Sequence, residues 1–178
     1  AISGASALTW LREPVCTSST CPYTYGYATP RGVESGQVPA GFPGLVSLLR
    51  LHGDRKRLII ALGTNDASAG CERPTSPAAM RNVQRLLALI PPGMDCVWIG
   101  PPQYRRGPVF KDCGENYNRY VDVLHATVTR SCCFIDSRLI RDPSTGSPIE
   151  ADAADEVHFT ARLGEVWARA LAPMLRAR

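Results

Sequence analysis

Three short apolar runs alternate with helix-like patterns along this chain, and that alternation limits the folds it can adopt. The runs are 57–63 (RLIIALG), 96–100 (CVWIG) and 132–136 (CCFID). An unbroken apolar run of this length is typical of a strand that is buried on both faces, as in a parallel sheet. Residues 1–3 fit the end of a preceding strand, although the segment is too short to establish one.

Between and after these runs, apolar residues recur at intervals of three and four, the spacing of a helix face. They define three stripes: Met80, Val83, Leu87 and Ile90; Tyr117, Tyr120, Val121, Leu124 and Val128; and Leu163, Val166, Trp167, Ala170, Leu171 and Met174. Ser76 and Thr160 are candidate N-caps, and residues 42–51 predict a shorter helix. The alternation predicts a three-layer α/β/α sandwich with a central, mostly parallel sheet.

Length, composition and charge exclude several other classes of protein. A chain of 178 residues can bury a sizeable core but would be cramped as two domains, so we expect one domain over residues 1–178. No apolar stretch approaches the roughly 20 residues that a membrane span needs. The net charge is +4, but the basic residues are scattered and lack interleaved aromatic residues. We therefore predict no nucleic-acid partner.

Seven cysteines are many for a chain of this length, since cytosolic proteins keep their thiols reduced and rarely accumulate them. Metal binding is the competing interpretation, but the sequence has no C-x-x-C pair and its histidines lie away from the cysteines. We therefore predict disulfides, no metal and a secreted or periplasmic protein. The sequence begins at Ala1 without a signal peptide, so we expect a mature or trimmed form.

The pairing of these cysteines is left open, because connectivity does not follow from sequence. Cys16 and Cys21 bracket a short loop and are the easiest local pair, while Cys71 and Cys113 are a second candidate pair. Cys96 lies within an apolar run and is predicted to be a buried free thiol.

Ligands of open parallel sheets bind beyond the carboxyl ends of strands, so the polar segments near these ends are informative. Segments 4–6 (GAS) and 63–66 (GTND) follow predicted strands, 32–36 (GVESG) lies between them, and 155–158 (DEVH) comes just before the last predicted helix. Taken singly, each has an ordinary structural interpretation: Ser6 as a turn hydroxyl, Gly36 as a positive-φ position, Asn65 as part of a turn. Their order along the chain is what indicates chemistry.

This ordered set resembles the SGNH (GDSL-type) hydrolase family, over residues 4 to 158. GTND at 63–66 is the most specific block, DEVHFT at 155–160 matches the D-x-x-H-x-T form, and GVESG at 32–36 is similar to the family's glycine block. The resemblance implies the flavodoxin-like SGNH hydrolase fold.

The same resemblance implies a catalytic triad and an oxyanion hole. Ser6 would be the nucleophile, His158 its base, and Asp155 the acceptor that orients the histidine. The oxyanion donors would be the backbone N–H groups of Ser6 and Gly36 and the side-chain amide of Asn65. The family usually has GDS where this chain has GAS at 4–6, but the missing aspartate is not the nucleophile. We interpret Asp66 as structural, bracing the Asn65 loop, and expect no cofactor.

The leading hypothesis is a monomeric esterase that removes a short acyl group, above all an O-acetyl group, from a cell-wall or extracellular polysaccharide. The absence of a long apolar lid-like segment favours small acyl groups. Two alternatives stay open: a lipase or thioesterase acting on longer acyl chains, and a catalytically silent carbohydrate-binding domain on the same fold.

Overall fold

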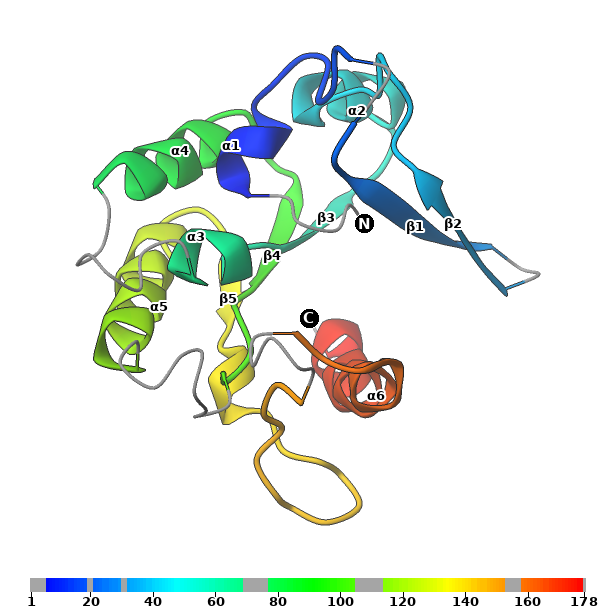
Figure 1. Ribbon diagram of the computed structural model, residues 1–178. Helices are drawn as coiled ribbons and strands as arrows, with labels where there is room; N and C mark the ends of the chain where they lie inside the picture. The colour runs from blue at the N-terminus through cyan, green and yellow to red at the C-terminus, as the bar shows by residue number, and fades with distance from the viewer. Residues whose placement is uncertain are drawn as a thin grey trace.

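A computed structural model of the chain describes residues 6–18, 21–29, 32–68, 77–104, 114–152 and 158–177. The elements in chain order are α1 (Ala7–Trp10), β1 (Thr24–Thr29), β2 (Gly32–Gln37), α2 (Leu45–Leu51), β3 (Arg57–Ala61), α3 (Thr64–Ser68), α4 (Pro77–Leu87), β4 (Asp95–Ile99), α5 (Gly114–Val128), β5 (Cys133–Ile135), a 3-10 turn η1 (Ser137–Leu139) and α6 (Ala161–Arg176). Figure 1 shows their arrangement.

The three apolar runs are confirmed as strands of one parallel sheet, in the order β3-β4-β5. The register pairs Leu58 with Cys96 across β3 and β4, and Val97 with Cys133 across β4 and β5. Because all three strands run the same way, their carboxyl ends meet at one edge of the sheet. The expected strand at residues 1–3 lies outside the described residues.

Helices cover both faces of this sheet, as the sequence predicts. Alternate side chains of β4 enter two different cores: Trp98 packs with residues of α1, α2, α4 and α5, whereas Val97 packs with residues of α6. Figure 1 shows α4 and α5 on one side of the strands and α6 on the other. The three-layer α/β/α arrangement is therefore confirmed. Of the helices described, none combines the length and apolar character of a transmembrane helix.

An antiparallel hairpin of β1 and β2 is an element that the sequence analysis did not predict. Its register pairs Tyr25 with Gly36, and Figure 1 shows it extending away from the parallel sheet. Segment 24–37 lacks a continuous apolar run, so the pattern used to find the other strands does not detect it. Its tyrosines and threonines at 24–29 are the signal that was available, since aromatic and β-branched residues favour strands.

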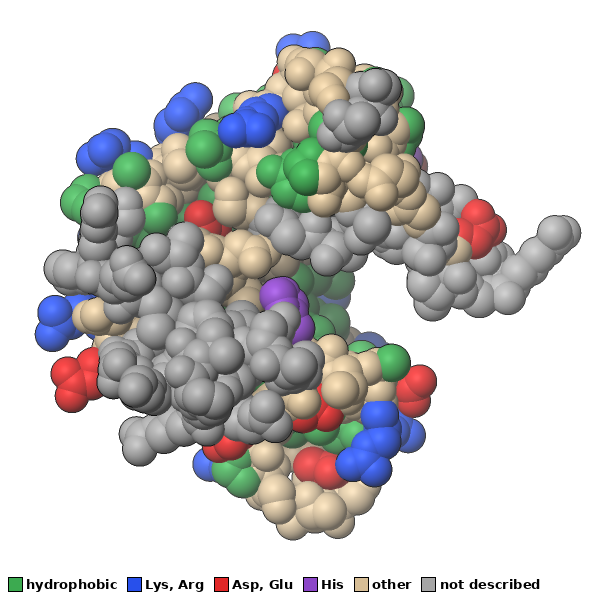
Figure 2. Space-filling view, viewed as in Figure 1, with side chains coloured by type: hydrophobic (Ala, Val, Ile, Leu, Met, Phe, Trp, Pro, Cys, Tyr) green, Lys and Arg blue, Asp and Glu red, His purple; other side chains and the backbone are tan. Residues whose placement is uncertain are grey.

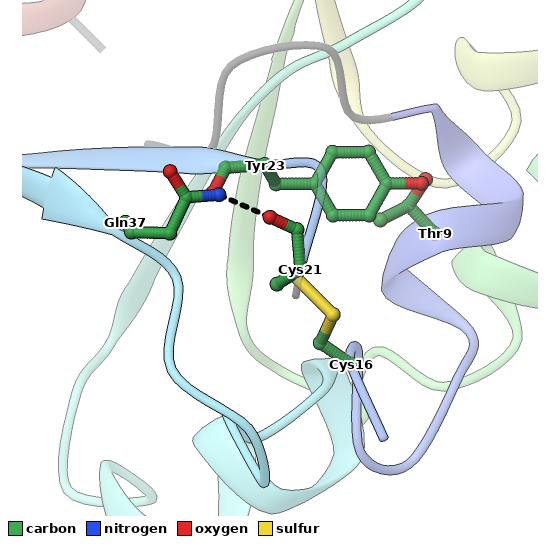
Figure 3. Close-up of a disulfide and its surroundings, with 5 residues drawn as sticks. All are labelled: Thr9, Cys16, Cys21, Tyr23 and Gln37. Atoms are coloured by element: carbon green, nitrogen blue, oxygen red, sulfur yellow. Dashed lines mark hydrogen bonds between the residues drawn. A yellow bond between two sulfur atoms is a disulfide. The ribbon is translucent and has the colours of Figure 1, made fainter. Parts of the chain in front are cut away.

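The predicted disulfide between Cys16 and Cys21 is confirmed. Both cysteines are buried in a small cluster with Val15 and Val38. The side-chain amide of Gln37 donates a hydrogen bond to the Cys21 carbonyl oxygen, which ties this disulfide loop to the end of β2 (Figure 3).

The prediction that Cys96 is a free thiol is wrong, because Cys96 forms a disulfide with Cys132. The register that pairs Val97 with Cys133 also brings the preceding residues together, with a Cα–Cα distance of 4.7 Å between Cys96 and Cys132. Within the described part of the chain, the free cysteine is Cys133. The candidate pair Cys71 and Cys113 lies outside the described residues.

A charged cluster joins the carboxyl end of β5 to α5. The Arg138 guanidinium donates to both carboxylate oxygens of Asp136, to Asp122 at 2.7 Å, and to the backbone and side-chain oxygens of Asn118. Arg138 and Asp136 are only 14% and 13% exposed. Burial raises the pKa of Asp136, but the hydrogen bonds and charge of Arg138 outweigh burial, so that this pKa lies below its ordinary value.

We expect Arg138→Met to lower the free energy of unfolding by about 2–3 kcal/mol, because it leaves the Asp136 carboxylate buried without its partner. Urea denaturation at pH 7 measures this loss. The difference from wild type should shrink in acid, since a carboxylate with a lowered folded-state pKa loses its stabilising effect as pH falls through that pKa. Asp122→Asn is the control: Asp122 is 67% exposed, and its loss should cost below about 1 kcal/mol. Equal losses in the two variants would contradict this account.

Candidate active site

Ser6 lies at the start of α1, where it is half-buried and acts as the N-cap. Its hydroxyl accepts from the Thr9 N–H at 3.4 Å, and its own N–H donates to the Thr9 hydroxyl at 3.1 Å. The Thr9 hydroxyl donates in turn to that of Tyr23 (Figure 3). The capping bond to the Ser6 oxygen is long for a hydrogen bond, so it is weak enough to be exchanged for another partner.

Asn65 is the second residue of α3, a short helix that begins just after β3. Gly63 makes the turn between them with φ +122°, a conformation that L side chains rarely adopt, and an added Cβ would lie 3.0 Å from side-chain atoms of Leu124 and Pro101. The glycine of GTND is therefore required by backbone conformation and by space. The ordinary interpretation of Asn65 as part of a turn does not hold, because the residue lies in the first turn of a helix.

One hydrogen bond brings the Ser6 and Asn65 segments together. The backbone N–H of Ala7 donates to the Asp66 carboxylate at 3.2 Å, although the two residues are 59 positions apart. Ala7 directly follows Ser6, and Asp66 directly follows Asn65. Asp66 thus braces the serine segment, a contact that sequence analysis did not foresee. Burial raises the pKa of Asp66 above its ordinary value, although the bond from Ala7 acts in the opposite direction.

His158 lies just before α6 and is exposed. It lines a pocket of about 190 Å³ at the carboxyl ends of the strands, together with Thr64 after β3, Pro101 after β4, and Phe159 and Trp167. Figure 2 shows a histidine side chain on this face of the molecule, beside a hollow that adjoins α6. Since Thr64 precedes Asn65, the Asn65 segment and His158 lie at the same edge of the sheet.

Asp152 holds the backbone around His158. Its carboxylate accepts from the N–H and the hydroxyl of Thr160, both at 2.6 Å, and its own N–H donates to the His158 carbonyl oxygen at 3.2 Å. These bonds join Asp152, just before segment 153–157, to His158 and Thr160, which follow it. Asp155 falls in that segment, outside the described residues, and its role as the partner of His158 stays a prediction.

The structure supports the predicted places of some site residues and not of others. Ser6 and Asn65 come from distant parts of the sequence, and the bond between their neighbours Ala7 and Asp66 joins their segments, while His158 lines a pocket with Thr64 at the carboxyl edge of the sheet. Gly36 lies inside β2 and not at the end of a strand of the parallel sheet, so its expected place in the fold needs correction. Its part in the oxyanion hole stays a prediction. Within the described ranges, no three or more His, Cys, Asp or Glu side chains are arranged to hold a metal ion.

A second, larger hollow of about 490 Å³ runs along β3. It contacts the consecutive residues 58–62, and since successive strand residues point to opposite faces, the hollow follows the edge of the strand. Leucines of α2 line its other side, and it shares Ala61 and Leu62 with the pocket of His158. This hollow could not be predicted from the sequence, because the spacing of apolar residues does not reveal how α2 packs against β3.

No family model and no curated protein matches this sequence. Among solved structures, a carbohydrate acetylesterase family member from Sinorhizobium meliloti is similar with a TM-score of 0.53 and 19% identity, covering 75% of this chain and 66% of that chain. A lipase/acylhydrolase from Enterococcus faecalis is similar with a TM-score of 0.53 and 21% identity, covering 75% of this chain and 69% of that one.

The match therefore spans just under two thirds of the first of these structures and slightly more of the second. At this level of identity the likeness establishes the fold alone. This chain has the α/β fold that its resemblance to the SGNH hydrolases implied, and it shares that fold with an acetylesterase family member and an acylhydrolase.

Proposed function

We propose that this protein is a serine esterase that hydrolyses short acyl esters, O-acetyl groups above all, on a cell-wall or extracellular polysaccharide. The hydrogen bond from Ala7 to Asp66 carries the proposal, because it joins the residue after Ser6 to the residue after Asn65. His158 lines a pocket at the same edge of the sheet. A nucleophile, a base and a neutral amide donor are the groups that acyl transfer requires.

In this mechanism Ser6 gives its proton to His158 as its oxygen attacks the ester carbonyl carbon. The carbonyl oxygen becomes an oxyanion and accepts from the Gly36 N–H, from the Asn65 amide, and from the Ser6 N–H, which must first leave the Thr9 hydroxyl to which it donates at 3.1 Å. His158 then returns the proton to the departing sugar hydroxyl, leaving an acyl-serine. Water attacks the acyl-serine by the same route, while Asp155 orients the imidazole.

The size of the pocket beside His158 supports a short acyl group. A volume of about 190 Å³ has room for an acetyl group and part of the sugar that carries it, and Phe159 and Trp167 give the pocket an apolar wall. The similar structure of a carbohydrate acetylesterase family member from Sinorhizobium meliloti agrees with this substrate class. The two disulfides among the described residues agree with a secreted or periplasmic protein.

The hollow along β3 favours a second candidate, an esterase or thioesterase for longer acyl chains. Its lining is mostly apolar, although His52, Arg55 and Arg57 also contribute, and it meets the His158 pocket at Ala61 and Leu62. An acyl chain too long for the smaller pocket would extend toward this hollow.

Two measurements test the proposal together. Hydrolysis of p-nitrophenyl acetate, butyrate and octanoate gives the acyl preference, and kcat/KM should be highest for acetate. A fluorophosphonate probe followed by peptide mapping should label Ser6. A maximum at octanoate would select the second candidate. If the folded protein neither reacted with the probe nor hydrolysed any of the three esters, it would be a catalytically silent domain.

A further inference from the structure

We propose that Asp66 is a positioning residue, whose carboxylate sets the separation between the Ser6 hydroxyl and the Asn65 amide. This inference rests on the proposed function and extends it to Asp66. The sequence indicated only that Asp66 braces the loop of Asn65. Asp66 touches no substrate in this account. It acts through the backbone of the two residues that do the chemistry.

The geometry makes this bond a direct link between nucleophile and oxyanion donor. Ala7 donates to Asp66 at 3.2 Å, and only one peptide unit separates each end of the bond from Ser6 or Asn65. Both ends are held in the core: Ala7 is fully buried, and Ala67, which follows Asp66, is 2% exposed. A movement of Ala7 or Asp66 would therefore also move Ser6 or Asn65. Misplacement of a reacting group by about 1 Å can lower the rate about 10²-fold.

Stability does not explain why a carboxylate occupies this position. Burial raises the pKa of Asp66, so the surroundings favour its neutral form. A group with a raised folded-state pKa stabilises the fold below its unfolded pKa, and that contribution is lost as pH rises through the raised value. Above that value the ionised side chain therefore costs stability. Asparagine would occupy nearly the same space and accept from Ala7 without that cost.

Tyr120 of α5, which interacts electrostatically with Asp66, also argues that the carboxylate is not there for stability. The Tyr120 hydroxyl is buried and has no hydrogen-bond partner within the described ranges. Burial raises the pKa of Tyr120, and the negative charge of Asp66 raises it further. What the carboxylate supplies is an acceptor for the Ala7 N–H at 3.2 Å, and a charged acceptor holds an N–H more strongly than a neutral amide does.

The test compares Asp66→Ala and Asp66→Asn with Asp142→Asn as the matched control. The Asp142 carboxylate also accepts a backbone N–H, from Ser144 at 2.7 Å, but in an exposed turn. For each variant we would measure kcat and KM for p-nitrophenyl acetate, the fraction of sites labelled by fluorophosphonate, and Tm between pH 4 and 8.

We expect Asp66→Ala to lower kcat per labelled site by about 10- to 100-fold with little change in KM, because the oxyanion donor acts only in the transition state. The loss of a donor itself, about 10²–10³-fold, sets the upper limit. Asp66→Asn should lose less, about 2- to 10-fold, while its Tm at neutral pH equals or exceeds that of the wild type. Asp142→Asn should keep the wild-type kcat.

An unchanged kcat per labelled site in both Asp66 variants, accompanied by a lower Tm, would show a merely structural role and overturn the proposal. If Asp66→Ala does not fold, Asp66→Asn alone decides, because it retains the acceptor. Failure of the proposed function is a different result: the wild-type protein itself would neither hydrolyse the ester nor bind the probe.

Discussion

Replacing Ser6 by alanine is expected to lower kcat/KM for p-nitrophenyl acetate by at least about 10⁴-fold, and His158→Ala should do the same. Without Ser6 no acyl-enzyme forms. Without His158 the serine hydroxyl keeps its proton and is a poor nucleophile at neutral pH. Initial rates at several ester concentrations, with circular dichroism to confirm folding, measure both effects.

The double variant provides a sharper check, since the two residues act as a unit. Ser6→Ala/His158→Ala should be little worse than either single variant, because removing one member already abolishes the shared step. Ser144→Ala and His125→Ala are matched controls at exposed positions, and both should keep wild-type rates. If Ser6→Ala or His158→Ala retained wild-type activity, the proposed mechanism would be wrong.

Removing the disulfide between Cys96 and Cys132 by a double alanine substitution is expected to lower the free energy of unfolding by about 4 kcal/mol. The two cysteines are 36 positions apart, and cross-linking a loop of that length removes much conformational entropy from the unfolded chain. Both cysteines are also buried, so the substitution leaves space in the core. Urea denaturation of both proteins measures the difference.

Two other cysteine variants serve as controls. The same entropy relation gives only about 2 kcal/mol for the disulfide between Cys16 and Cys21, whose separation is 5. Cys133→Ala removes a thiol that forms no disulfide and should cost below about 1 kcal/mol. If the Cys96/Cys132 variant were no less stable than the Cys133 variant, this disulfide would not stabilise the fold.

Part of the fold could be predicted because periodicity is a local property. The run at 96–100 predicted β4, and its alternate residues Val97 and Trp98 enter different cores, as expected of a strand covered on both faces. The stripe from Tyr117 to Val128 predicted α5, and both of these residues are buried. The hairpin of β1 and β2 was missed, because its strands have no continuous apolar run.

The candidate site, like the fold, could be predicted from the sequence only in part. Asn65 and His158 were identified because their motifs are short and lie directly after a strand or before a helix. Ser6 was identified from its place in the order of motifs. The bond from Ala7 to Asp66 was not predicted, because it joins residues 59 positions apart whose separation in space depends on how α1 and α3 pack.

The sequence by itself determined the segments that become β3, β4, β5, α2, α4, α5 and α6, the parallel sense of the sheet, and the order of the motifs from which acyl transfer is proposed. These follow from the spacing of apolar side chains and from short motifs, both of which act over a few residues. Only the tertiary structure decided that Cys96 pairs with Cys132, that Asp66 holds the segment of Ser6, and that Gly36 lies in a hairpin. Strand register and helix packing decide these contacts, and both depend on the whole core at once, not on any local pattern.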